Sequence, residues 1–180
     1  MKKFRSAFII ILVAVVISLS CKKLISKLLP SFDTTVSDIE IAVPAIPFPI
    51  SGSVGNQTIH YNLDSVIKAN TGGVFGASDV SSITVKSIVI ALQNGDQLNN
   101  FANFEMLRID LSSSTNGTPV SIATASIPDA VSYNLSMDVS NANILSYFQG
   151  NQLTYNVFGK VRRSTSHELD GLATITVTVK

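Results

Sequence analysis

Residues that could carry out acid–base or metal chemistry are few and widely separated in this chain. The two histidines, His60 and His167, stand far apart in the sequence, and a zinc site would need both of them together with carboxylates. The motifs of serine hydrolases, phosphate-binding loops, zinc proteases and paired redox cysteines do not occur. We therefore expect no metal, no cofactor and no catalytic histidine.

The acidic residues form no pair whose spacing predicts catalysis. Glycoside hydrolysis needs two carboxyl groups facing each other across the substrate, whereas the acids here are expected at helix caps, strand ends, outward strand positions and loops. The candidates are Asp64, Asp79, Asp96, Asp110, Asp138 and Glu168. Asp96 is the only charge in the oxygen-rich loop 94–100 (NGDQLNN), which lacks the acidic spacing of an EF-hand. We expect a solvated turn there rather than a calcium site.

Six aromatic residues could form a platform for a carbohydrate or a peptide. They are Phe101, Phe104, Tyr147, Phe148, Tyr155 and Phe158. The chain has no tryptophan, the residue that most often stacks on sugars. We expect most of the six to pack in the core instead.

The single cysteine, Cys21, follows a segment with the plan of a secretory signal peptide. Three basic residues within the first five positions precede an unbroken apolar run from Ala7 to Ile17, and Ser18, Leu19 and Ser20 come directly before the cysteine. The apolar run would rise only about 16 Å as a helix, whereas a bilayer core is about 30 Å thick. A short transmembrane anchor, with Cys21 merely ending the apolar segment, is the alternative.

The end of this segment resembles a bacterial lipoprotein signal. The resemblance implies that a signal peptidase recognises Ser18, Leu19 and Ser20, and that Cys21 is acylated and becomes the mature N-terminus. Two or more acyl chains give stable membrane attachment without a spanning helix. Lys22 stands where an aspartate would signal inner-membrane retention. We therefore expect a lipid-anchored protein of the bacterial cell envelope, at the outer membrane and facing the periplasm or the cell surface.

The composition describes a folded, mildly acidic domain after this signal. Hydrophobic residues make up 46% of the chain and charged residues 14%, a balance that excludes intrinsic disorder. After Pro30 there are seven basic and twelve acidic residues, so nucleic-acid binding is not expected. We divide the chain into a signal peptide (1–20), a lipidated tether (21–30) and one domain (31–180). The tether sequence 22–29 (KKLISKLL) fits either a helix on the membrane surface or an unstructured linker.

Alternation of apolar and polar residues predicts about eight strands in the domain. The expected strands are 38–43, 58–63, 82–93, 104–112, 119–124, 131–139, 153–162 and 173–179. The segment 88–92 is apolar on both faces, which indicates a central strand. The three prolines of 43–50 (VPAIPFPI) exclude a central strand there and favour an extended segment at a sheet edge or crossing between sheets.

Turns and two short helices divide these strands. The dipeptides Asn94-Gly95, Asn116-Gly117 and Asp170-Gly171 favour turns with positive φ. We expect one helix over 65–70, capped by Asp64, and another over 142–149, capped by Ser140 or Asn141. The expected fold is all-β, an immunoglobulin- or fibronectin-like antiparallel β-sandwich of about eight strands with two short helices.

The stretch 137–161 (MDVSNANILSYFQGNQLTYNVFGKV) resembles the C-terminal half of type-2 late-embryogenesis-abundant (water-stress) domains. In those domains a strand, a short helix and a second strand follow one another, and the second strand ends near a glycine, here Gly159. The resemblance implies a fibronectin-like sandwich with protective or lipid-associated binding roles.

Together these features predict a membrane-anchored lipoprotein whose domain is a non-catalytic binding or structural module. Its partners would be membrane lipid, through acylated Cys21, and an envelope protein or surface polymer. One alternative is a lipid or apolar-ligand binding protein, which needs an apolar cavity of a few hundred cubic ångströms between the sheets. The other alternative is an envelope enzyme, which needs acids or a histidine converging in a cleft.

Overall fold

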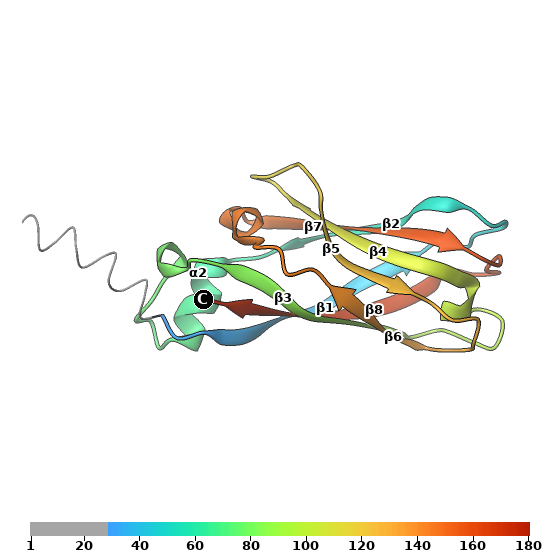
Figure 1. The fold of residues 1–180 in the computed structure, drawn as a ribbon, viewed down its shortest axis with the longest axis horizontal. Helices are drawn as coiled ribbons and strands as arrows, with labels where there is room; N and C mark the ends of the chain where they lie inside the picture. Colours follow the sequence, from blue (N-terminus) through green and yellow to red (C-terminus); the bar gives the residue numbers. More distant parts are fainter. Residues whose placement is uncertain (1–28) are drawn as a thin grey trace, which may run out of the picture.

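The computed structural model describes residues 29–180, which form a two-layer antiparallel β-sandwich (Figure 1). The strands are β1 (Phe32–Val43), β2 (Ser51–His60), β3 (Ile83–Leu92), β4 (Phe104–Ser113), β5 (Val120–Ser126), β6 (Asn134–Val139), β7 (Gln152–Val161) and β8 (Leu169–Val179). The helices are α2 (Leu63–Asn70) and three 3₁₀ turns, η1 (Ala77–Asp79), η2 (Phe101–Asn103) and η3 (Leu145–Gln149). The all-β class and the eight strands confirm the fold expected from the alternating pattern.

The sandwich is one sheet curled over on itself. Its strand order is β1-β8-β3-β6-β5-β4-β7-β2, and every neighbouring pair is antiparallel. Strands β1, β8, β3 and β6 form one layer, and β5, β4, β7 and β2 form the other. Only two residue pairs, Ala123 with Val139 and Thr124 with Asp138, join the layers through β5 and β6. On the opposite side the outermost strands β1 and β2 approach each other at Ala42 and Gly55.

The core fills the space between the layers. On β7 the side chains of Leu153, Tyr155 and Val157 point inward, as the alternation predicts, and each is at most 2% exposed. Strand β3 lies between β8 and β6, which confirms the central position expected from its apolar character. The proline-containing segment between β1 and β2 passes from one layer to the other, as predicted.

Two details of the helices differ from the sequence-based expectation. Helix α2 begins at Leu63 and its cap is Asn62, whose side chain accepts a hydrogen bond from the Ser65 amide at 2.9 Å. Asp64 is therefore not the cap; its carboxylate pairs with Lys68 and accepts from the Ala77 amide. The second helix is the short 3₁₀ turn η3, whose cap residue is Ile144 rather than Ser140 or Asn141; isoleucine has no polar side chain, so η3 has no side-chain cap.

The glycine turns also differ from expectation. Among the described glycines, positive φ occurs at Gly72 (62°) and Gly73 (79°), after helix α2, and not at the glycines of the three predicted dipeptides. Asp170 and Gly171 belong to β8 rather than to a turn. A side chain at Gly171 would lie 3.2 Å from the Ile90 Cγ2 atom, so this glycine serves close packing between strands. Strand β6 begins at Asn134, and Val131 lies in the loop before it.

The two ends of the sandwich carry different structures. Residue 29, helix α2, η1, η3 and the C-terminus lie at one end, which we call the tether end (Figure 1). The four connections 44–50, 93–103, 127–133 and 162–168 lie at the other, which we call the far end. Leu29, assigned to the tether from the sequence, is only 7% exposed and packs in the core. Among residues 29–180 no helix has the length and apolar character needed to cross a bilayer.

Candidate functional site: the loops of the far end

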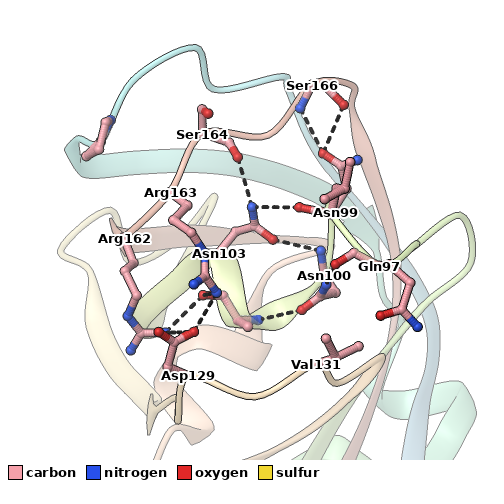
Figure 2. A pocket seen from close by; sticks show the side chains of 13 residues that line it. Gln97, Asn99, Asn100, Asn103, Asp129, Val131, Arg162, Arg163, Ser164 and Ser166 are labelled. Atoms are coloured by element: carbon pink, nitrogen blue, oxygen red, sulfur yellow. Dashed lines mark hydrogen bonds and ion pairs between the residues drawn. The ribbon is translucent and has the colours of Figure 1, made fainter.

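The far-end loops enclose a depression of about 880 Å³, seen from close by in Figure 2. Its lining comes from all four connections and includes Pro49, Asn99, Val131 and Arg162. Because the strands alternate in direction, residues far apart in the sequence meet here. This meeting of four loops on a rigid scaffold is the arrangement in which binding sites are common.

Three buried asparagines form the floor of this depression. Asn99, Asn100 and Asn103 are each 2% exposed. The Asn103 side chain accepts a hydrogen bond from the Asn100 amide and donates to the carbonyls of Leu98 (3.0 Å) and Ser164 (2.8 Å). Asn99 accepts hydrogen bonds from the amide and hydroxyl of Ser166 (Figure 2). The asparagines thus tie the β3–β4 loop to the β7–β8 loop.

Asp96 organises the start of the same loop. Its carboxylate accepts hydrogen bonds from the backbone amides of Leu98 and Asn99 and from the Asn99 side chain. These bonds stabilise the charged form and hold the pKa of Asp96 below its usual value; the Asn99 side chain has the largest effect, and His167 adds a small electrostatic contribution. The conformation of the loop is therefore stabilised by hydrogen bonds from its own side chains.

The two arginines of the far end are held by backbone carbonyls. Arg162 donates to the carbonyl oxygens of Ala102 and Ile127, each at 2.9 Å, and Arg163 donates to that of Ala102 at 3.0 Å. Arg163 also pairs with Asp129, while the nearest Arg162–Asp129 distance is 3.7 Å. Several N–H groups of the two guanidinium groups are bonded to backbone carbonyls, and the Asp129 carboxylate lies beside them. These contacts stabilise the conformation of the loops.

Exposed apolar side chains also lie on the far-end loops. Phe48 is 62% exposed, Leu98 80% and Val131 49%, and each belongs to a different far-end loop. Beneath the proline-containing segment, a second depression of about 510 Å³ is lined mainly by apolar residues, among them Ile46, Phe48 and Val54. Two hydrogen bonds of 2.9 Å hold this segment in place: the Ile46 amide donates to the Thr165 hydroxyl oxygen, and the Thr165 amide donates to the Ile46 carbonyl. The far end therefore presents apolar side chains on loops whose backbones are fixed.

A third depression, of about 620 Å³, lies at the tether end. Tyr61 and Phe148 line it with their rings edge to face, 5.1 Å between centroids. The Tyr61 hydroxyl is buried without a hydrogen-bond partner, and burial raises the pKa of Tyr61 to about 12. Burial likewise raises the pKa of Tyr155, with a smaller contribution from Tyr61.

The structure does not bring the two histidines together. His60 ends β2 at the tether end, whereas His167 lies at the far end with its Nε2 atom 3.4 Å from the Asn94 carbonyl oxygen. Asp110 accepts two hydrogen bonds from Arg108, and Asp79 accepts one from the Gly76 amide. Within residues 29–180, no three histidine, aspartate or glutamate side chains gather as a metal site would require.

Most of the remaining predicted site residues lie either in the core or in the part of the chain that the structure does not describe. Five of the six aromatic candidates are buried, as expected: Phe101, Phe104, Tyr147, Phe148 and Tyr155. Phe158 lies on the outer face of β7, 4.6 Å below the Arg108 guanidinium. Cys21 and its recognition residues Ser18, Leu19 and Ser20 lie outside the described residues.

Sequence reasoning missed the far end as a site. It treated 94–100 as a solvated turn, whereas Asn99 and Asn100 are buried. The available signal was the asparagine spacing 99, 100 and 103, since consecutive amide side chains beside a strand favour local capping of backbone groups. The contact between this loop and the connection 162–168 has no signal in the sequence, because it depends on the order of the strands in the sheet.

Comparisons with known proteins reveal only distant structural likenesses. No family model matches the chain, and no curated protein matches it. The infectious bursal disease virus Gx strain structure is 9% identical with a TM-score of 0.38, covering 83% of this chain and 32% of that one. AlgX of Pseudomonas aeruginosa is 9% identical with a TM-score of 0.37, covering 78% and 26%. The capsid of Helicobacter pylori bacteriophage KHP30 is 9% identical with a TM-score of 0.32, covering 83% and 97%.

The chain spans less than two thirds of the first two of these proteins. Their TM-scores are too low to support any statement about the function of this protein.

Proposed function

We propose that the protein is a lipid-anchored lipoprotein of the bacterial envelope that acts as a non-catalytic binding module through its far-end loops. The sequence supports the anchor, because the only cysteine follows a signal-like segment at Cys21. The described fold supports the binding role, because three exposed apolar side chains lie on its far-end loops.

The observation that carries this proposal is the placement of Leu29. It is buried in the core at the tether end, and only seven residues separate it from Cys21. An anchor at Cys21 would hold the tether end near the membrane and direct the far end away from it. The far-end loops would then be accessible to an envelope protein or a surface polymer.

Metabolic labelling with an alkynyl fatty acid tests the anchor. The wild-type protein should take up the label, and Cys21→Ala should not, because the thiol is the proposed site of acylation. Ser31→Ala, a change at an exposed residue, serves as the matched control and should label like the wild type. Equal labelling of wild type and Cys21→Ala would refute the anchor.

Partner capture tests the far-end loops. Acylated protein carrying Phe48→Ala, Leu98→Ala and Val131→Ala should lose the envelope partner that the wild type captures. A control with Val89→Ala and Met106→Ala changes exposed apolar residues on the strand faces, 40% and 36% exposed, and should keep that partner. Loss of the partner in both variants would exclude the far end as the specific surface.

Apolar-ligand binding is a second candidate, favoured by the tether-end depression. Tyr61, Leu63, Val80 and Phe148 give this depression an apolar part close to the proposed anchor. The likeness of 137–161 to late-embryogenesis-abundant domains also supports a lipid-associated role. The space between the sheets is filled by side chains such as Ile88 and Ile109, each 1% exposed, so a ligand would have to enter at this end. Titration with a fluorescent fatty acid tests it, and absence of saturable binding would exclude it.

A further inference from the structure

One large apolar side chain at the tether end is strongly exposed. Val74 is 73% exposed, in the loop 71–76 (TGGVFG) between α2 and η1, which contains no charged residue. Its neighbour Phe75 is turned the other way and packs against the core. Transfer of such an apolar side chain from water into an apolar phase is favourable.

Hydrogen bonds keep this loop in a fixed shape. The Thr71 amide and hydroxyl both donate to the Ile67 carbonyl, at 3.0 and 2.7 Å, and the Gly73 amide donates to the Lys68 carbonyl at 2.8 Å. The Phe75 amide donates to the Thr71 hydroxyl oxygen at 3.3 Å. Gly72 and Gly73 have positive φ, and a Cβ atom at either position would meet no atom within 4 Å. Glycine is therefore favoured there by the backbone conformation and not by lack of space. Val74 is thus directed outward by the fold.

The position of this loop relative to the proposed anchor is restricted by chain length. Eight peptide units lead from Cys21 to Leu29, a span of at most about 28 Å even when fully extended. Phe32, at the start of β1, pairs with Val179, and the Ser81 and Ser82 amides donate to the Lys180 carbonyl. The start of the domain, its C-terminus and the segment that follows the loop therefore lie side by side (Figure 1).

We propose that the loop 71–76 is a lipid-contact site, in which Val74 enters the membrane interface and holds the sandwich upright on the bilayer. This inference rests on the proposed anchor at Cys21. Lys180 places a cationic side chain at the same end, and Lys68, beside the loop, pairs there with Asp64. Such residues suit the headgroup region of a membrane. Acyl chains alone would restrain one point, whereas a second contact restricts the tilt of the long axis.

The absence of tryptophan from the chain makes the test direct. A single tryptophan is introduced at Val74→Trp or, as the matched control, at Phe48→Trp, which replaces a comparably exposed residue at the far end. Each acylated full-length variant is bound to phosphatidylcholine vesicles with and without brominated acyl chains. We expect the brominated lipid to reduce the emission of Val74→Trp by at least half, with a blue shift, and to leave that of Phe48→Trp unchanged.

Flotation of the same vesicles separates the possible failures. If the acylated protein does not float with them, the proposed anchor has failed. If it floats while Val74→Trp is not quenched, the anchor holds and the lipid-contact site is overturned. Equal quenching of both tryptophans would mean that the domain lies on its side, which also overturns the proposal. Circular dichroism of each variant establishes that the sandwich is intact.

Discussion

Asn103 has a larger structural role than its residue type suggests. Its side chain makes three hydrogen bonds at 2% exposure, and its backbone carbonyl accepts from the Arg162 and Arg163 amides. We expect Asn103→Ala to lower the free energy of unfolding by about 2–3 kcal/mol, because buried backbone groups lose their partners. Chemical denaturation measures this.

The control for Asn103 is Asn70→Ala on helix α2. The Asn70 side chain donates to the Val66 carbonyl at an exposed position. Water replaces that bond, so the expected change is within about 0.5 kcal/mol. If the two variants are equally stable, the buried network does not hold the far end together.

Two tyrosines provide opposite predictions from the same chemical change. The Tyr61 hydroxyl is buried without a partner, whereas the Tyr147 hydroxyl donates to the Thr118 carbonyl at 2.9 Å. Tyr61→Phe should leave stability unchanged or raise it by about 1 kcal/mol, and Tyr147→Phe should lower it by about 1 kcal/mol. Urea denaturation of both variants compares them. A larger loss for Tyr61→Phe would show that its hydroxyl has a partner in solution.

At the scale of elements, the closure of the sandwich depends on a glycine in β2. A Cβ atom at Gly55 would lie 2.9 Å from the Ala42 carbonyl oxygen of β1, whereas one at Gly52 would meet nothing within 4 Å. Gly55→Ala should therefore lower the free energy of unfolding by about 1–3 kcal/mol through overpacking, and Gly52→Ala should not. Thermal or urea unfolding distinguishes them, and equal stability would mean that β1 and β2 separate readily.

The strands were predictable and the helix caps were not, for a physical reason. Apolar and polar residues alternate along most of β7 and β8, because one face of each strand is buried. The prediction of a strand therefore rests on many residues and does not depend on any one of them. A cap depends on one side chain, and Asn62 and Asp64 are both good capping residues. The Asp64 carboxylate instead pairs with Lys68 within the same helix and accepts from the Ala77 amide, and the second of these contacts exists only once η1 packs beside α2.

At the scale of the whole molecule, Leu29 connects the tether to the core. It is 7% exposed, whereas the adjacent Pro30 is exposed. Leu29→Ala should lower the free energy of unfolding by about 2–3 kcal/mol, and Pro30→Ala should have little effect. Chemical denaturation of the purified protein with each change measures this. If Leu29→Ala is neutral, the folded unit begins later and the tether is longer than proposed.

The local features of this protein could be read from its amino-acid sequence alone. The period of the apolar residues depends only on neighbours along the chain, and it yielded eight strands, a central β3 and a crossing segment rich in proline. The signal-like segment before Cys21 is likewise a local pattern, and the anchor that it predicts awaits labelling.

Only the tertiary structure decided which loops share an end. One partner of Asn103, the Ser164 carbonyl, lies 61 positions away on another loop. The exposed residues Phe48, Leu98 and Val131 share one end only because eight strands alternate in direction. Such contacts follow from strand order and sheet closure, which single-chain periodicity does not encode, because the same alternating strands fit many orders equally well.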